Sequence, residues 1–303
     1  MRLSELVFDK NAIVRDAIFD GMGACEASPN MPILTYISDS KYIPFLKKNK
    51  DISCVIATHE MAPLVPEEMG LYISASPKEE FFLLHNSIAK NPSYARARFE
   101  TKIGKSCSIS HLAHISEENV IIGNNVVVEE FVSIKQNVVI GDGTIIRAGS
   151  IIGGSGFEFK KYNEEIFGVA HLGGVLLGDN VEISHNVCVM ASVFPWDDTI
   201  IGSQTKIDNL VHIAHACKLG RRNFITAGVI FCGSAVTEDD VFIGPNATIA
   251  NVKMKKHSRA SLGSVVTRDV PDNSIVSGNF AVEHKKLLRF LASMNTWADH
   301  RIE

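Results

Sequence analysis

The sequence has no apolar run long enough to cross a bilayer, and it has no excess of positive charge. Its 303 residues carry a formal net charge of −4, so the composition does not favour a nucleic-acid or anionic-membrane partner. The N-terminal stretch alternates charged and apolar residues and lacks the apolar core of a signal peptide. These absences indicate a cytoplasmic protein with no stable membrane insertion.

Cysteine is sparse and irregularly placed. No two cysteines form a CxxC pair; the six are Cys25, Cys54, Cys107, Cys188, Cys217 and Cys232. Scattered cysteines of this kind fit free thiols in a reducing cytosol better than disulfides. No metal-ligand spacing is evident either, so we expect no metal site.

What the sequence has instead is a period of six residues. A large hydrophobe stands at nearly every sixth position from Ile201 to Ile249, with Thr237 as the exception. The members are Ile201, Ile207, Ile213, Leu219, Ile225, Phe231, Ile243 and Ile249, and earlier series run through Ile122, Val128, Ile134, Ile140, Ile146 and Ile152 and through Leu177, Ile183 and Val189. A period of six fits neither a helix nor a plain strand alternation, so a repeating coil must produce it.

A second position of each six-residue unit is also restricted. The fifth residue is small or β-branched, as at Val211 and Cys217, although Asn223 departs from this rule. One large and one compact inward position per unit suit a narrow prism whose walls are short strands. Glycines recur 18 residues apart, as at Gly202 and Gly220. Three walls per 18-residue coil predict a triangular parallel β-helix, which we place at residues 99–278.

The flanking segments lack the period. Residues 1–98 alternate strand-like runs with helix-like stretches such as residues 78–90, which predicts a small α/β domain. Residues 279–303 are expected to hold an amphipathic helix that caps the coils or packs between subunits, with apolar residues at Leu287, Leu288, Phe290, Leu291 and Met294. Residues 153–174 and 190–199 interrupt the coil. Such excursions are typical of active-site loops and argue against a purely structural solenoid.

The coil register places a histidine beside a glycine. His215 is third in its unit and should point outward, and one coil of 18 residues leads from it to Gly233. Adjacent coils lie about 4.8 Å apart. A histidine base next to an open backbone N–H suits acyl transfer, because the base deprotonates the acceptor while the N–H stabilises the tetrahedral oxyanion. The alternative is that His215 is a solvated corner residue.

The segment around His215 resembles the catalytic stretch of a known enzyme family. Ile207-Asp208-Asn209, followed by Ile213-Ala214-His215-Ala216, is similar to the I-D-N-x-x-x-I-A-H-N pattern of the UDP-3-O-acylglucosamine N-acyltransferases of lipid A synthesis, which are hexapeptide-repeat acyltransferases. This resemblance implies a left-handed β-helix. It also implies that His215 is the base, that Asp208 and Asn209 are its supporting acid and amide, and that Gly233 supplies the oxyanion N–H.

The position of Asp208 leaves one question open. Asp208 lies seven residues before His215 and therefore on a different wall of the same coil. Whether the two side chains meet depends on a corner or on a neighbouring subunit. Upstream, Gly154-Ser155-Gly156-Phe157 resembles the family's loop motif, which makes Phe157 a candidate substrate contact.

The N-terminal domain resembles the family's nucleotide-binding domain. There an aromatic residue, an asparagine and a tyrosine hold uracil, and the matching residues here are Tyr36, Asp39 and Tyr42. Two aromatic rings can sandwich a base, although both tyrosines could instead belong to the domain core. Asp39 departs from the family, because a carboxylate only accepts hydrogen bonds whereas an amide also donates them. The identity of the base is therefore open.

Two further differences from the family concern regions that would contact the substrates. Asn251 and Val252 stand where the family has a Gly-His pair, and the nearby His257 is out of register. The C-terminal helix, which in the family engages the acyl carrier protein, is short. The expected chemistry is therefore clearer than the expected substrates.

The resemblance implies a homotrimeric acyltransferase with its active site between subunits and no bound cofactor. We expect transfer of an acyl group from an acyl carrier protein or coenzyme A thioester to the amino group of a nucleotide-linked amino sugar, in the synthesis of lipid A (lipopolysaccharide) or a surface polysaccharide. One alternative is a sugar O-acetyltransferase that uses acetyl-coenzyme A. The other is a non-catalytic nucleotide-sugar-binding protein on the same fold.

Overall fold

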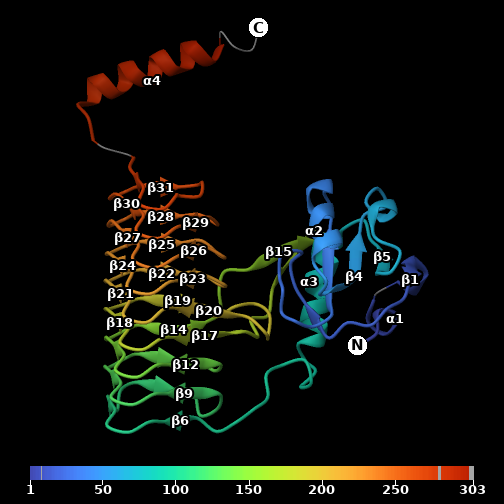
Figure 1. Ribbon diagram of the computed structural model, residues 1–303, viewed down its shortest axis with the longest axis horizontal. Helices are drawn as coiled ribbons and strands as arrows, with labels where there is room; N and C mark the ends of the chain where they lie inside the picture. Colours follow the sequence, from blue (N-terminus) through green and yellow to red (C-terminus); the bar gives the residue numbers. More distant parts are fainter. Residues whose placement is uncertain (8, 279–280, 300–303) are drawn as a thin grey trace.

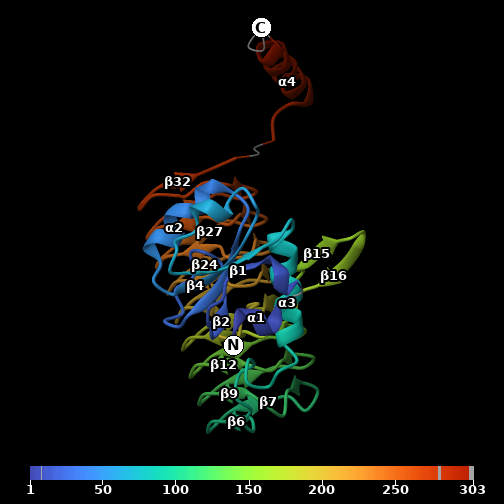
Figure 2. The same ribbon diagram turned by 90° about the vertical axis from the view of Figure 1, so that its right-hand side faces the viewer.

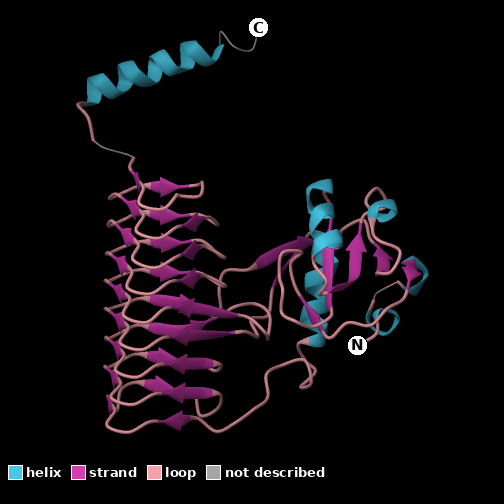
Figure 3. Cartoon of the chain, in the orientation of Figure 1, coloured by secondary structure: helices cyan, strands magenta, loops and turns pink. Residues whose placement is uncertain are grey.

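A computed structural model describes residues 1–7, 9–278 and 281–299 of the chain. A long β-helix stands beside a small α/β domain, and a helix lies beyond the C-terminal end of the coils (Figure 1 and Figure 3). This arrangement confirms the fold class predicted from the sequence, a mainly β chain built on a parallel β-helix with an N-terminal α/β domain and a C-terminal helix.

The β-helix has three parallel sheets, which we call the first, second and third walls in the order in which the chain visits them. The first wall contains β6 (Lys102–Ile103), β9 (Val120–Ile122), β12 (Val138–Ile140), β17 (Gly174–Leu177), β20 (Asp198–Ile201), β23 (Lys218–Leu219), β26 (Val236–Thr237) and β29 (Lys253–Met254). The second wall contains β7 (Ser108–Ile109), β10 (Val127–Val128), β13 (Ile145–Ile146), β18 (Glu182–Ile183), β21 (Lys206–Ile207), β24 (Phe224–Ile225), β27 (Phe242–Ile243), β30 (Arg259–Ala260) and β32 (Ile275–Val276). The third wall contains β8 (His114–Ile115), β11 (Ser133–Ile134), β14 (Ile151–Gly154), β19 (Cys188–Met190), β22 (His212–Ile213), β25 (Ile230–Phe231), β28 (Thr248–Ile249) and β31 (Val265–Val266).

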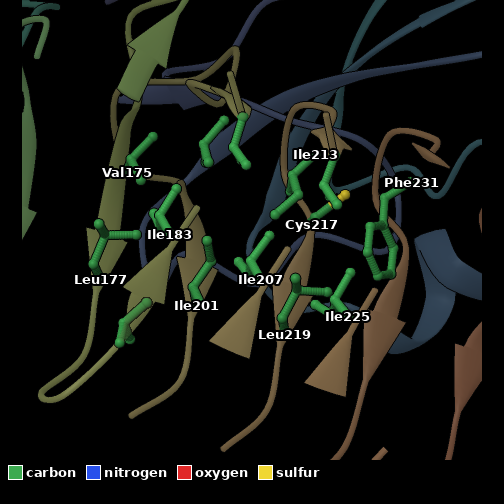
Figure 4. Packing of buried hydrophobic residues seen from close by; sticks show 14 of the residues in the cluster. Val175, Leu177, Ile183, Ile201, Ile207, Ile213, Cys217, Leu219, Ile225 and Phe231 are labelled. Atoms are coloured by element: carbon green, nitrogen blue, oxygen red, sulfur yellow. The ribbon is translucent and has the colours of Figure 1, made fainter. Parts of the chain in front are cut away.

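The pairing register confirms the coil length. Ile207 pairs with Ile225, and Ile225 with Ile243, so neighbouring strands in these regular coils are 18 residues apart in sequence. The large residues of the six-residue period point into the prism and form one buried cluster (Figure 4). Because each coil contributes only a few side chains, this core is continuous along the stack and is held by neighbouring coils.

The two exceptions to the sequence pattern meet inside this core. Thr237 is 3% exposed and Asn223 is fully buried. Asn223 donates from Nδ2 to the Thr237 hydroxyl at 2.6 Å, and its Oδ1 accepts the Val241 N–H at 2.7 Å. Each buried polar group thus has a partner, which removes most of the cost of desolvating it.

The N-terminal domain is a five-stranded sheet in the order β1-β5-β4-β3-β2, in which β1 is antiparallel to β5. Its strands are β1 (Ile13–Arg15), β2 (Gly21–Met22), β3 (Ile33–Ile37), β4 (Ile52–Ala57) and β5 (Gly70–Ile73). Its helical segments are α1 (Leu3–Leu6), η1 (Lys10–Ala12), η2 (Ser40–Tyr42), α2 (Ile43–Lys48), η3 (Ala62–Leu64) and α3 (Pro77–Ile88). The parallel pairs and their helices are what the alternating sequence pattern predicts for an α/β domain.

Both excursions from the coil reach this domain from the edge between the third and first walls. The first forms an antiparallel hairpin of β15 (Phe159–Tyr162) and β16 (Glu165–Gly168), which extends toward α3 (Figure 1 and Figure 2). The second carries Trp196, whose indole N–H donates to the Met22 carbonyl at 2.8 Å. Phe194 stacks on Trp196 at 5.7 Å between ring centroids and meets Phe81 edge-on at 6.0 Å. The excursions therefore fix the α/β domain against one edge of the prism.

The C-terminal helix α4 (His284–Asp299) stands away from the coils instead of covering their end (Figure 1). Its apolar residues Leu287, Leu288, Phe290 and Leu291 are exposed. Capping of the stack, one of the two roles expected for this helix, is therefore not observed. The side chain of Met294 lies outside the described residues. Among the helices described here, none combines the length and apolarity required to cross a membrane.

Candidate functional site

His215 follows β22 in the turn between the third and first walls, an edge that we call the His215 edge. Both excursions leave the coil at this edge, after β14 and after β19. The residues that interrupt the period and the candidate base are therefore brought together by the fold. The α/β domain lies over the same edge, so His215 is located between the two parts of the chain.

The imidazole of His215 packs against Gly233 of the next coil. A Cβ added at Gly233 would lie 2.6 Å from both Cε1 and Nε2 of His215, closer than real atoms approach. Among the described residues, no hydrogen-bond acceptor for the Gly233 N–H is found. The stacking that the 18-residue register predicts is thus observed, and it needs glycine because any side chain would push the ring away.

Glu158 is the carboxylate that contacts His215. Its Oε2 lies 3.3 Å from Nε2 of His215, and its Oε1 pairs with the Lys160 ammonium. The hydrogen bond to His215 is the main reason that the pKa of Glu158 falls to about 2; burial opposes this shift and Lys160 adds to it. Sequence reasoning missed Glu158, because it lies in an excursion where the period gives no register.

His171 is a second residue that the sequence did not indicate. Its ring lies 6.1 Å from that of His215, in an edge-on arrangement. Its Nε2 accepts the Gly156 N–H at 3.2 Å, and its Nδ1 lies 3.1 Å from the Val169 carbonyl. Burial lowers the pKa of His171, and the nearby His215 lowers it further. Because Nε2 accepts the Gly156 N–H, the ring proton of His171 lies on Nδ1, which faces the Val169 carbonyl.

His215 and Glu158 line a cleft of about 640 Å³. This volume lies within the range of about 300–1,000 Å³ that small-molecule sites occupy. The α/β domain contributes Glu26 and Phe82, and the coils contribute Lys218 and Asn251 among others. Asn251, which replaces a glycine of the family's Gly-His pair, thus lies in the same cleft as His215. The cleft is lined by both parts of the chain and combines apolar walls with a few polar groups.

Asp208 and Asn209 lie on another edge of the prism, between the second and third walls, which we call the Asp208 edge. Asp208 accepts the Asn209 N–H at 2.7 Å, and the Asn209 side-chain oxygen accepts the His185 N–H at 3.0 Å. Asp208 borders a pocket of about 190 Å³ with Glu182 and Phe224, separate from the His215 cleft. Within one chain, therefore, the expected acid and amide do not meet the expected base.

The residues expected to bind the nucleobase make local contacts within their own domain. Tyr36 packs on Phe81 and Phe82, with ring centroids 5.0 and 6.1 Å away, and burial raises its pKa to about 12. Asp39 begins η2 by accepting the Lys41 N–H at 2.9 Å and also pairs with the Lys41 ammonium at 3.2 Å. Its carboxylate thus caps the start of the short helical segment that follows it.

Tyr42 and Phe157, the other two expected substrate contacts, lie in different surroundings. The Lys41 ammonium lies 5.0 Å from the centre of the Tyr42 ring, so one face of Tyr42 meets a cation. Phe157 is 90% exposed and touches Phe159 at 4.9 Å between ring centroids.

No cluster of three or more metal-binding side chains occurs in the part of the chain that the structure describes.

Comparison with known proteins supports the resemblance. The family model described as bacterial transferase hexapeptide (six repeats) matches residues 119–154. A UDP-3-O-acylglucosamine N-acyltransferase of Wolinella succinogenes is 33% identical over 147 residues, which cover 48% of this chain and 46% of the relative. UDP-3-O-acylglucosamine N-acyltransferase 2 of Legionella pneumophila is 29% identical over 242 residues, covering 66% and 64%. The chain thus spans about half to two thirds of the length of these relatives.

A solved structure gives the same fold. The UDP-N-acetylglucosamine acyltransferase of Arabidopsis superposes with a TM-score of 0.50 at 24% identity, over 59% of this chain and 68% of that one. At this identity the likeness concerns the fold alone. The sequence relatives confirm that the chain resembles the UDP-3-O-acylglucosamine N-acyltransferases, as its motifs predict.

Proposed function

We propose that this chain is an acyltransferase that moves an acyl group from a thioester to the amino group of a nucleotide-linked amino sugar. The observation that carries the proposal is the contact of the His215 imidazole with Gly233, inside a cleft of about 640 Å³. His215 is the base that deprotonates the acceptor amine, and the Gly233 N–H donates to the oxyanion that forms when the amine attacks.

The names of the relatives support the substrate class, since both act on UDP-3-O-acylglucosamine. The proposed donor is an acyl carrier protein or coenzyme A thioester, and the proposed setting is lipid A or surface polysaccharide synthesis in the cytoplasm. Tyr36 and Tyr42 are the proposed contacts of the nucleotide, and Phe157 is a further proposed substrate contact. Because Asp39 is paired with Lys41, we do not restrict the base to uracil.

We also propose that the chain forms a homotrimer in which the Asp208 edge of one subunit meets the His215 edge of the next. Large apolar side chains are exposed along the Asp208 edge and the walls that flank it; they are Leu112, Phe131, Leu210, Phe224, Ile230, Leu262, Val265 and Ile275. A patch of this kind is typical of a protein–protein interface. In such a trimer, Asp208 and Asn209 of one subunit reach the cleft of its neighbour, which would reconcile their positions with the family motif.

Leu210→Asp is expected to break this trimer. Leu210 is 66% exposed and adopts a φ of 61°, a conformation that aspartate tolerates, so the single chain should keep its fold. A charge in the interface should shift the protein from trimer to monomer and lower turnover with it. Analytical ultracentrifugation measures the mass. Ile166→Asp, on the exposed hairpin, is the control that should stay trimeric; an unchanged Leu210→Asp trimer would contradict the proposed interface.

The activity itself is tested by thiol release. Purified protein is mixed with acetyl-coenzyme A or an acyl carrier protein thioester and a panel of nucleotide amino sugars, and the free thiol is titrated. Amide formation on an amino sugar, identified by mass spectrometry, is the expected result. An ester product on non-amino sugars would favour the O-acetyltransferase. Nucleotide-sugar binding without thiol release from any donor would favour a non-catalytic binding protein.

A further inference from the structure

We infer that Glu158 binds the acceptor amine in its ammonium form beside His215, and that this contact makes the site select amines over hydroxyl groups. The inference rests on the proposed acyl transfer and goes further, since it assigns the choice between amide and ester formation to one side chain. It concerns a residue of the first excursion and not of the repeating coil.

The geometry favours a ligand atom with several donors. Glu158 Oε2 and His215 Nε2 are 3.3 Å apart, so one nitrogen can lie within ordinary hydrogen-bonding distance of both. In the free site Glu158 Oε2 accepts from His215 Nε2. When the ring proton of His215 lies on Nδ1, both Oε2 and Nε2 are acceptors, and an ammonium with its three N–H donors can serve both at the same time. A hydroxyl has a single O–H, which can donate to only one of them. The pair therefore discriminates by the number of donors as well as by charge.

The acidic groups of the site also favour binding of an ammonium. The contact with His215, aided by Lys160, lowers the pKa of Glu158 to about 2, so the carboxylate is ionised at neutral pH before the acceptor binds. Lys160 occupies Oε1 only, which leaves Oε2 on the His215 side. The Glu158 side chain is 17% exposed, so solvent screens its charge less than it would a surface carboxylate. Glu26 also lines the cleft and adds a second acidic group, whereas the ammonium of Lys218, another residue of the lining, is paired with Asp197.

The position of the carboxylate is set by the α/β domain. The backbone carbonyl of Glu158 accepts the Val169 N–H at 2.8 Å, which closes the base of the hairpin. The hairpin is fixed to α3, where Asn86 donates to the Gly168 carbonyl at 2.7 Å and accepts the Ala170 N–H at 2.9 Å. Lys160, the partner of Glu158, lies 4.7 Å from the centre of the Phe82 ring. Glu158 is thus preorganised before the acceptor binds.

The reaction of the bound ammonium with the thioester releases one proton overall. The bound ammonium gives one proton to His215 Nε2, and the lone pair of the neutral amine attacks the thioester carbon. The new C–N bond forms while the carbonyl electrons move to the oxygen, which faces the Gly233 N–H. The C–S bond then breaks, the thiolate takes the proton from His215, and the nitrogen releases its second proton to solvent. The products are an amide, a thiol and a proton.

The test compares two ligands that differ in one group. UDP-glucosamine carries an amine where UDP-glucose carries a hydroxyl, and isothermal titration calorimetry gives a Kd for each. The wild-type protein is expected to bind UDP-glucosamine about tenfold to hundredfold more tightly, the range of one charge-assisted hydrogen bond. Glu158→Gln keeps the shape of the side chain and should bind both sugars with similar Kd values.

Glu164→Gln is the matched control. Glu164 belongs to the same hairpin, but its side chain is 91% exposed and pairs with Lys161. This variant should keep the wild-type ratio of Kd values. Equal binding of the two sugars by the wild-type protein, no binding of either, or a ratio that survives in Glu158→Gln would overturn the inference.

Failure of the inference can be told apart from failure of the proposed activity. If the wild-type protein prefers the amine through Glu158 but releases no thiol with any donor, acyl transfer is wrong while the role of Glu158 in ligand selection stands. If thiol is released equally well with amino and non-amino sugars, acyl transfer stands and the role of Glu158 is wrong.

Discussion

His215→Ala is expected to lower turnover by about two to four orders of magnitude, the usual contribution of a positioned general base. His215 is the imidazole that borders the cleft beside Gly233, and the nearby His171 already uses Nε2 to accept the Gly156 N–H. His171 is therefore not free to replace it in the same position. Steady-state thiol release with the best substrate pair measures the loss.

The fold should survive this substitution, because the His215 side chain lies on the surface of the prism and outside its buried cluster. Thermal unfolding followed by circular dichroism should give nearly the wild-type midpoint. His111→Ala is the control, since His111 is an exposed turn residue among the first coils and does not line the cleft. Turnover of His215→Ala near the wild-type rate would show that another group acts as the base.

The sequence was sufficient to place His215 against Gly233, because both residues belong to the regular coil. There the six-residue period fixes which residues stack, and the structure bears out the contact. The same counting put Asp208 on a different wall from His215, and the structure places it on another edge. Where the chain is periodic, sequence position translates directly into position in space.

The position of Glu158 could not be predicted from the six-residue period. Residues in an excursion have no register, and the contact of Glu158 with His215 depends on a hairpin that α3 holds in place through residues more than 80 positions earlier in the chain. Asp39 shows a second limit. The motif suggested a ligand contact, whereas its carboxylate is used to begin a short helical turn with Lys41. Local hydrogen bonds of this kind compete with the role that a motif match suggests.

Gly233→Ala is expected to lower turnover by about 100-fold, although it removes no polar group. The new Cβ would lie 2.6 Å from Cε1 and Nε2 of His215, so the ring must move away. A displacement of about 1 Å at a catalytic group can cost about 100-fold in rate. Gly233 is not among the glycines with positive φ, so alanine fits the backbone and the unfolding midpoint should change little.

A double-mutant cycle separates the displaced base from other effects. If the added methyl group acts only through the His215 ring, Gly233→Ala should have no further effect once His215 is already alanine, because the cycle isolates the coupling between the two residues. Gly278→Ala, where an added Cβ would meet nothing within 4 Å, should leave turnover unchanged in both backgrounds. An additive loss in the double variant would mean instead that the methyl group blocks the thioester or distorts the Gly233 N–H, and the oxyanion side of the site would then be the part that requires glycine.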